Sequence, residues 1–230
     1  MPHAAQPDSI VVQLNALAGG LFLLSAFGMV ATRQVQGCMR FFILQSVFLA
    51  SSAVLLGIEP RSWHLIAVGI INLVNKAILI PWLFRKTVSE EVYTKREIVQ
   101  VLNIPISLLV ALGLTVGSYF LAAPLMKVGA GLPALANLPI GLATLLLGAY
   151  TLTVRREAVP QLLGILSMEN GAFFASIAVA PELHMFIELV VAFDLLVAVF
   201  VIGVLTRTIQ RHIGTTEVGS LAALKEESVR

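Results

Sequence analysis

Seven long apolar stretches constrain what this chain can fold into. The hydrocarbon core of a bilayer is about 30 Å thick and needs roughly 20 apolar residues in a helix. Stretches of about that length lie at residues 10–32, 41–58, 63–84, 105–121, 138–154, 158–180 and 184–208. Only 12% of the 230 residues are charged, whereas a soluble domain has about 25%. The sequence therefore predicts an all-α, polytopic membrane protein of about seven transmembrane helices, in contact with a lipid bilayer.

These stretches divide the chain into four parts. We expect a four-helix membrane region at residues 1–121, an outside loop at 122–137, a three-helix region at 138–208 and a cytoplasmic tail at 209–230. The connection at residues 85–100 carries both signs of charge, which is typical of an exposed loop or an interfacial helix. The start of the chain lacks the basic residues of a signal peptide, so the first stretch is expected to remain as a helix.

The Lys and Arg residues are unevenly distributed over the connections. With the N-terminus outside, the inside segments hold twelve of them and the outside segments hold two. This is a strong positive-inside bias, and it indicates an outside N-terminus and a cytoplasmic C-terminus. The inside residues are Arg33, Arg40, Arg85, Lys86, Lys95, Arg96, Arg155, Arg156, Arg207, Arg211, Lys225 and Arg230, and the outside ones are Arg61 and Lys127.

Residue types that bind metals are few and scattered. Cys38 is the one cysteine, and a single thiol cannot form an internal disulfide, a structural zinc site or an iron–sulfur cluster. The four histidines show no H-x-x-x-H spacing, and no Walker, G-x-S-x-G, G-x-G-x-x-G or C-x-x-C motif occurs. A net charge of +2 does not indicate nucleic-acid binding. We therefore expect no cofactor, no metal and no covalent chemistry in this chain.

Lys76 lies deep in the third apolar stretch, in the run I-I-N-L-V-N-K-A-I-L-I-P-W. It is about eight residues, or roughly 12 Å, from the inner end of that stretch, which is too far for its side chain to reach water easily. Asn72 shares its helix face, Asn75 precedes it directly, and Pro81 frees a backbone carbonyl nearby. A buried lysine of this kind serves either as a proton-relay or charge-coupling group, or as the partner of a carboxylate needed only for assembly.

Glu169 lies at the middle of the sixth stretch, within Q-L-L-G-I-L-S-M-E-N-G-A-F-F. Asn170 and Gly171 follow it, and Gly164 precedes it. Glycines allow a neighbouring helix to approach closely, which would shield the carboxyl group. Glu169 is therefore a candidate for proton or ion relay, with a purely structural role as the alternative.

Asp194 lies at the middle of the seventh stretch, and Glu188 lies nearer the outer surface of the same stretch. His184 and Glu188 are four residues apart and share a helix face, so they are candidates for an entry or exit pair. The alternative is an interfacial salt bridge in water.

Other polar residues in the stretches are expected to be structural. The amides of Gln13, Asn15, Gln45 and Gln161 fit interhelical hydrogen bonds. Trp63 and Trp82 lie at opposite ends of the third stretch, as interfacial anchors do.

Several of these motifs together resemble the hydrogenase-4 component E family. The resemblance rests on Q-L-L-G-I-L-S-M-E-N-G at residues 161–171, Pro181-Glu182, the helix E-L-V-V-A-F-D-L-L-V-A-V-F and the tail L-A-A-L-K. The spacing from Lys76 to Pro81 is similar as well. The similarity covers most of the chain, and M-E-N-G within an apolar helix is its most specific part.

This resemblance implies a membrane subunit of a group 4 nickel–iron hydrogenase or formate hydrogenlyase-like complex, in the plasma (inner) membrane of a prokaryote. The last three helices are similar to the K subunit of complex I, in which two successive helices each carry a buried acid. By this similarity, Glu169 and Asp194 take the two acid positions. The implied partners are antiporter-like and complex I-like membrane subunits and a soluble hydrogenase or related redox module, and those subunits would hold the nickel–iron centre and the iron–sulfur clusters.

Two other classes of function stay in view. A stand-alone cation/proton antiporter subunit would carry the same buried charges without a redox partner. A seven-helix retinal protein needs a Schiff-base lysine, usually in its last helix, and residues 184–204 contain none.

Overall fold

Every regular element of this chain is helical in the part that the structure describes. The structure is a computed structural model and describes residues 10–58, 62–87, 102–128, 133–179 and 203. The elements are α1 (Ile10–Ala31), α2 (Val35–Ile58), α3 (Trp63–Asn72), η1 (Leu73–Leu79), α4 (Ile80–Thr87), α6 (Ile104–Val128), η2 (Pro133–Ala136), α7 (Asn137–Val154) and α8 (Ala158–Val179).

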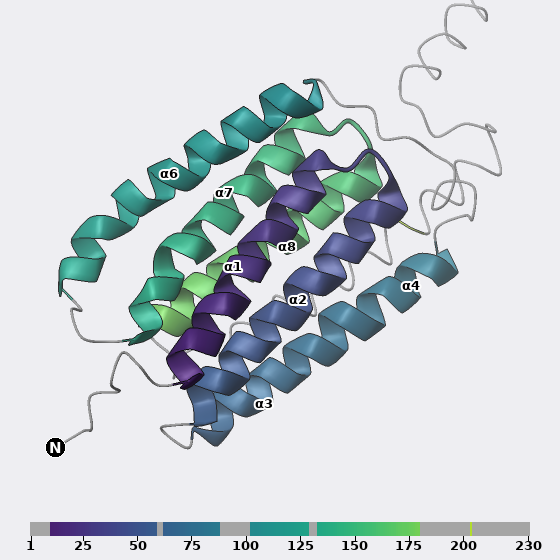
Figure 1. Ribbon diagram of the computed structural model, residues 1–230. Coiled ribbons are helices and arrows are strands. Elements are labelled where there is room, and N and C mark those ends of the chain that lie inside the picture. The colour runs from purple at the N-terminus through teal and green to yellow at the C-terminus, as the bar shows by residue number, and fades with distance from the viewer. Residues whose placement is uncertain (1–9, 59–61, 88–101, 129–132, 180–202, 204–230) are drawn as a thin grey trace, which may run out of the picture.

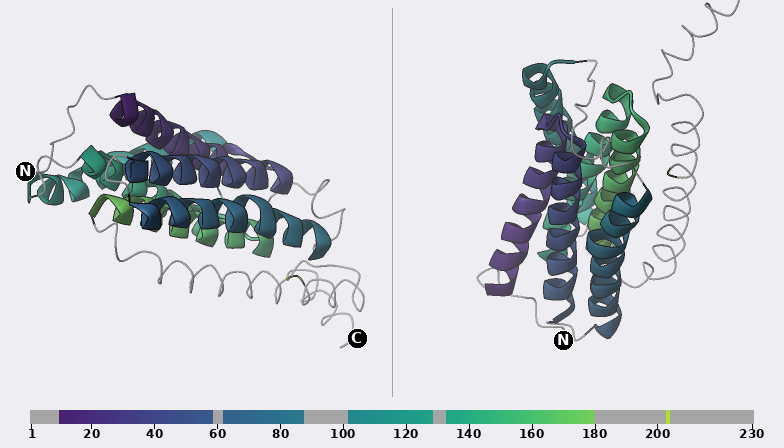
Figure 2. Two further views of the ribbon diagram at one scale, coloured as in Figure 1. Left: turned by 90° about the horizontal axis from the view of Figure 1, so that it is seen from below. Right: turned by 90° about the vertical axis from the view of Figure 1, so that its right-hand side faces the viewer.

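The long helices lie side by side in a bundle, with their axes roughly aligned (Figures 1 and 2). Helix α1 packs between α2 and α7, and α8 packs against α7 and α2. Helix α6 lies at one edge against α7 and α1, and the segment α3–η1–α4 lies at the opposite edge against α2. Helices α2, α7 and α8 thus surround the middle of the bundle, where the candidate site lies.

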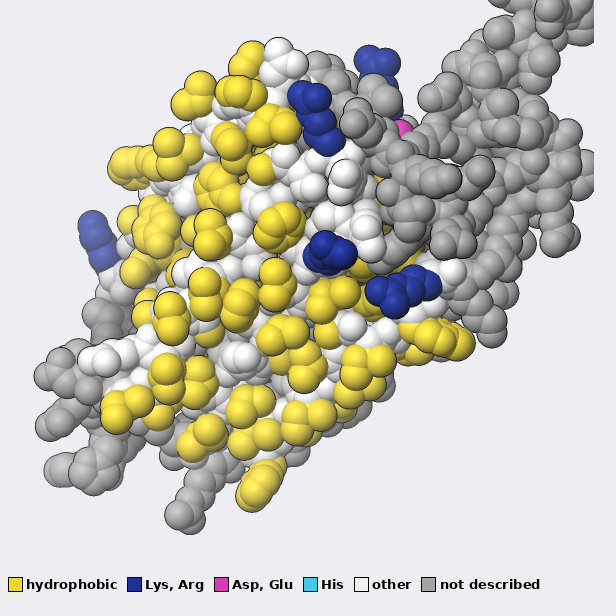
Figure 3. Space-filling model, turned by 45° about the vertical axis from the view of Figure 1, so that its right-hand side comes forward, with side chains coloured by type: hydrophobic (Ala, Val, Ile, Leu, Met, Phe, Trp, Pro, Cys, Tyr) yellow, Lys and Arg dark blue, Asp and Glu magenta, His cyan; other side chains and the backbone are white. Residues whose placement is uncertain are grey.

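The surface of this bundle is suited to lipid. Five segments are long and apolar enough to cross a membrane: Ile10–Ala31, Val35–Ile58, Leu65–Trp82, Ile104–Lys127 and Asn137–Val154. Large apolar side chains are exposed along them, and Figure 3 shows Lys and Arg toward the ends of a largely apolar face. The all-helical fold is therefore confirmed, and the first five predicted stretches are helical segments long and apolar enough to cross a membrane. The sixth predicted stretch is helix α8, which is not among these five. Apart from residue 203, the seventh lies outside the described residues, and the orientation of the chain stays a prediction.

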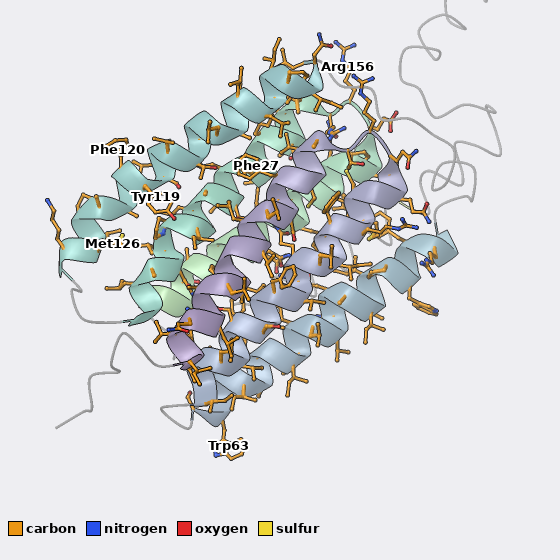
Figure 4. The ribbon with its side chains drawn as sticks, viewed as in Figure 1. Phe27, Trp63, Tyr119, Phe120, Met126 and Arg156 are labelled. Carbon is orange, nitrogen blue, oxygen red and sulfur yellow. The ribbon has the colours of Figure 1, made fainter. Side chains whose placement is uncertain are left out.

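The two ends of the bundle differ in charge. Arg33, Arg40, Arg85, Arg155 and Arg156 lie at one end, which we call the basic end. Trp63 lies at the opposite end, and Figure 4 shows it far from Arg156. Trp63 and Trp82 are both exposed, at 77% and 55%, as the interpretation of interfacial anchors requires.

The predicted loop at residues 122–137 begins too early, whereas its end agrees with the start of α7 to within one residue. Helix α6 continues to Val128, and the turn η2 leads directly into α7 at Asn137. Ala122 is fully buried in a cluster with Leu138 and Ala175. This packing holds the last turns of α6 in helical form, although Pro124 lies inside them and has no N–H to donate.

Glycines bring α7 and α8 into direct backbone contact. A Cβ at Gly148 would lie 2.6 Å from the backbone N of Met168, and a Cβ at Gly141 would collide with the backbone of Ala175. Gly171 on α8 would collide in the same way with Leu145. The predicted close approach of a helix to the glycines of α8 is therefore observed, and that helix is α7.

A buried arginine closes the basic end of α1. Arg155 is 1% exposed, and its Nη2 donates to the backbone oxygens of Met29, Val30 and Thr32 at 3.0, 3.1 and 2.8 Å. The last carbonyls of a helix have no partner within the helix, and a cation there also complements the helix dipole. Burial lowers the pKa of Arg155 from its ordinary value, but arginine stays protonated in proteins.

Replacing Arg155 by Met should lower the stability of the bundle, because three backbone oxygens of α1 would lose their donor. Leaving one such buried group unsatisfied costs about 1–3 kcal/mol. The measurement is thermal unfolding of the purified full-length chain in mild detergent. Arg156→Met is the matched control, since Arg156 is exposed. Equal melting temperatures for the two variants would contradict the capping role.

The glycine contact predicts opposite effects for two Gly→Ala substitutions. Gly148→Ala should lower the melting temperature, because overpacking of this kind costs about 1–3 kcal/mol. Gly113→Ala should leave it unchanged or raise it, since a Cβ at Gly113 meets nothing within 4 Å and alanine favours a helix by up to ~1 kcal/mol over glycine. The same unfolding assay compares them, and a stable Gly148→Ala protein would show that α7 and α8 can separate.

Candidate charge-coupling site

Lys76 lies in a π-helical segment at the middle of the third predicted span. The segment η1 joins α3 to α4 in one continuous helix, and the backbone N–H of Ile80 donates to the oxygen of Asn75, five residues earlier. Pro81 follows at once and has no N–H, so one carbonyl of the preceding turn loses its helical donor. Widened π turns occur often at functional sites. This turn places Lys76 inside the bundle, where only 1% of it is exposed.

Glu169 forms an ion pair with Lys76. The distance from Lys76 Nζ to Glu169 Oε1 is 2.9 Å, and the two side chains are 1% and 13% exposed. The pair joins η1 at one edge of the bundle to α8. Two charges this far from water interact much more strongly than a surface pair, and removing one partner of such a pair typically costs about 3–5 kcal/mol. The structure thus brings together two of the residues that the sequence predicts for the site.

Asn170 gives the lysine a second acceptor. Lys76 Nζ donates to Asn170 Oδ1 at 2.9 Å. The other side of the same amide, Asn170 Nδ2, donates to Gln45 Oε1 at 3.1 Å and to Ser46 Oγ at 3.3 Å. These two bonds fix the orientation of the amide, so that its oxygen rather than its nitrogen faces the ammonium group.

Helix α2 extends this network. Gln45 Nε2 donates to Ser167 Oγ at 3.0 Å, and Ser46 Oγ donates to the backbone oxygen of Phe42 at 3.0 Å. Gln45, Ser46 and Asn170 are fully buried. Gln45 is predicted to be structural, and no role is predicted for Ser46 or Ser167. The signal in the sequence is that polar residues at 45–46, 167 and 169–170 interrupt apolar stretches.

The remaining predicted residues fall into three groups. Asn72 is buried and Asn75 is half-buried, both near Lys76 along the same helix. Gly171 packs against α7 at Leu145 rather than at the ion pair. Three residues lie outside the described residues, namely His184, Glu188 and Asp194.

A second polar cluster lies toward the end opposite the basic end. Asn15 Nδ2 donates to Asn137 Oδ1 at 3.1 Å, Ser52 Oγ donates to Asn15 Oδ1 at 2.6 Å, and Asn137 Nδ2 donates to Ser52 Oγ at 3.0 Å. This closed triad pins α1, α2 and α7 together. It contains no ionisable group, which fits the structural role predicted for Asn15.

Apolar layers separate the ion pair from both ends of the bundle. Toward the triad, the rings of Phe22 and Phe174 stack at 4.3 Å between centroids, and Leu49 is fully buried beside them. Toward the basic end lies a cluster that includes Met39, Phe42 and Leu163. The charges therefore lie in surroundings of low polarity, in which each affects the other strongly.

The described residues contain no group of three His, Cys, Asp or Glu side chains that could hold a metal ion. Cys38 is buried, and its Sγ lies 3.7 Å from the backbone oxygen of Met29. The cluster around Lys76 and Glu169 has the chemistry to hold, share and exchange protons or charge.

The chain is similar to curated proteins over almost its whole length. An uncharacterised protein of Mycobacterium tuberculosis is 32% identical over 215 residues, which is 94% of this chain and 97% of that protein. Proteins named hydrogenase-4 component E, from Escherichia coli and Shigella flexneri, are each 28% identical over 222 residues, which is 92% of this chain and 97% of each relative. No family model and no solved structure matches the chain. The chain belongs to the hydrogenase-4 component E family.

Proposed function

We propose that this chain is an integral membrane subunit of a complex I-like hydrogenase or formate hydrogenlyase-type oxidoreductase. In this role its buried ionisable residues contribute to proton or sodium translocation, or to coupling between membrane subunits. The observation that carries the proposal is the ion pair of Lys76 and Glu169, held by amides in an otherwise apolar interior. The names of the relatives support the hydrogenase context.

The mechanism follows from the two acceptors of Lys76. Its ammonium group is shared between the Glu169 carboxylate and the Asn170 oxygen, both at 2.9 Å. When Glu169 takes up a proton, its attraction for Lys76 falls and the amide oxygen becomes the main acceptor. A change of charge on a neighbouring helix has the same effect from outside. The state of the pair thus depends on charges beyond this chain, which is what coupling requires.

Asp194 completes the proposal through the family resemblance. In the complex I K subunit two successive helices each carry a buried acid, and by this resemblance we propose that Asp194 exchanges charge with Glu169. In this proposal the nickel–iron and iron–sulfur centres belong to partner subunits, as the family resemblance implies.

Glu169→Gln should uncouple ion movement from electron transfer in the assembled complex. We expect hydrogenase activity with a soluble electron carrier to persist, while proton or sodium movement into inverted membrane vesicles falls by more than half. Asp194→Asn should act in the same direction. Glu157→Gln is the matched control, an acid-to-amide change on the connection before α8 and outside the span. Undiminished ion movement in both Glu169→Gln and Asp194→Asn would argue strongly against the proposal.

Moving the carboxylate by one residue separates pairing from relay. In Glu169→Gln/Asn170→Asp the new carboxylate still lies beside Lys76, and the Gln45 amide can turn over to donate to it while accepting from Ser167. We expect more assembled complex in this double variant than in Glu169→Gln alone. Ion movement should stay low, because the carboxylate would lie among Gln45 and Ser46 and not at the position of the Glu169 carboxylate. Full recovery of ion movement would show that only the charge balance of the pair matters.

Partner identity has its own measurement. Gentle solubilisation should bring nickel, iron and further membrane subunits along with this chain. Purification of the chain alone, with intact cation transport in liposomes, would favour a stand-alone antiporter subunit.

A further inference from the structure

Helix α2 and the segment α3–η1–α4 are antiparallel neighbours with a defined alignment. Away from the basic end, a Cβ at Gly69 would lie 3.1 Å from the Cβ of Ala53. Near the basic end, Met39 and Phe84 belong to the same buried apolar cluster. With α2 and α4 antiparallel, these two observations place residues near 40 on α2 at about the same level as residues near 84 on α4.

Two arginines directly follow Met39 and Phe84 in the sequence. Arg40 follows Met39, and Arg85 follows Phe84. One residue along an α-helix turns the side chain by about 100°. On antiparallel neighbours this rotation carries both side chains to the same side of the pair. Both arginines are exposed there.

The directions of the two side chains bring their charged groups to one depth. Side chains on a helix lean toward its N-terminus. Arg40 therefore leans toward the basic end, where α2 begins, and Arg85 leans toward the middle of the bundle, because α4 ends at the basic end. No Asp or Glu occurs in α2, α3, η1 or α4 to neutralise them.

An apolar strip continues from these arginines toward the middle of the bundle. On α2, one turn beyond Arg40, Leu44 is 44% exposed. On the neighbouring segment, Trp82, Ile78 and Val74 are 55%, 61% and 50% exposed. Figure 3 shows neighbouring dark-blue side chains beside a largely yellow surface. A pair of cations at one end of an apolar strip matches the polarity of an anionic phospholipid, which has a charged head group and apolar acyl chains.

We propose that Arg40 and Arg85 bind the phosphate of an anionic phospholipid, whose acyl chains lie along Leu44, Ile78 and Trp82. Guanidinium groups form paired, charge-assisted hydrogen bonds with phosphate oxygens. Basic sites between membrane helices bind anionic head groups in this way. The charge pattern favours a lipid over an acidic protein segment, because the strip below the arginines is apolar. This inference does not depend on the proposed function.

The test uses the full-length chain, purified in mild detergent with any subunits that accompany it, and phosphatidylglycerol and phosphatidylcholine as probes. Binding is measured by native mass spectrometry after lipid removal and titration. For Arg40→Gln/Arg85→Gln we expect about tenfold weaker binding of phosphatidylglycerol and unchanged binding of phosphatidylcholine. Arg33→Gln/Arg156→Gln removes the same charge from exposed positions at the same end, and it should leave both affinities unchanged.

Three results would overturn the inference. Equal losses in the two double variants would mean that the whole basic end attracts anionic lipid without a site. Unchanged binding in Arg40→Gln/Arg85→Gln would exclude a lipid role for this pair, and loss of a co-purifying subunit with lipid binding intact would identify an acidic protein as the occupant. Arg40→Lys/Arg85→Lys keeps the charge and guards against a folding defect, and it should retain phosphatidylglycerol more tightly than the Gln variant.

Discussion

A single buried ion pair sets the conditions for the middle of this bundle. Neither Lys76 nor Glu169 is stable alone in apolar surroundings, so each requires the other helix to be in place. The same requirement explains the amides around them. Asn170 satisfies a further N–H of the lysine, and Gln45 holds that amide in the right orientation. The charge pair therefore determines which residues of α2 and α8 have to be polar.

Helix α2 links the polar features of the interior. Gln45 and Ser46 belong to the network around the ion pair, and Ser52, about two turns further along, belongs to the triad with Asn15 and Asn137. Fully buried Leu49 lies between them. Polar groups in a membrane interior are satisfied only within the protein. Their grouping into two networks fixes α2 against its neighbours.

The sequence was sufficient for features that depend on local composition. Apolar length predicts the five spans, and depth within a span singles out Lys76 and Glu169. The pairing of these two residues depends on which helices are neighbours, and a single sequence carries no signal for that. Arg155 is likewise far along the chain from the end of α1 that it caps, so the sequence carries no signal for that contact either. At Pro124, turn-forming composition predicts a loop, but the burial of Ala122 and the partial burial of Met126 favour the helix.

The glycine contact between α7 and α8 has a mechanical consequence for the ion pair. Because the backbones of α7 and α8 touch, these two helices cannot slide or rotate past one another without collision. They therefore form a rigid pair that holds Glu169 in a fixed position. Lys76 lies instead in a π-helical segment. A π turn contains one residue more than an ordinary helical turn, so this segment can absorb a shift in register. A conformational change in this subunit would thus move Lys76 relative to Glu169, whose carboxylate stays in place.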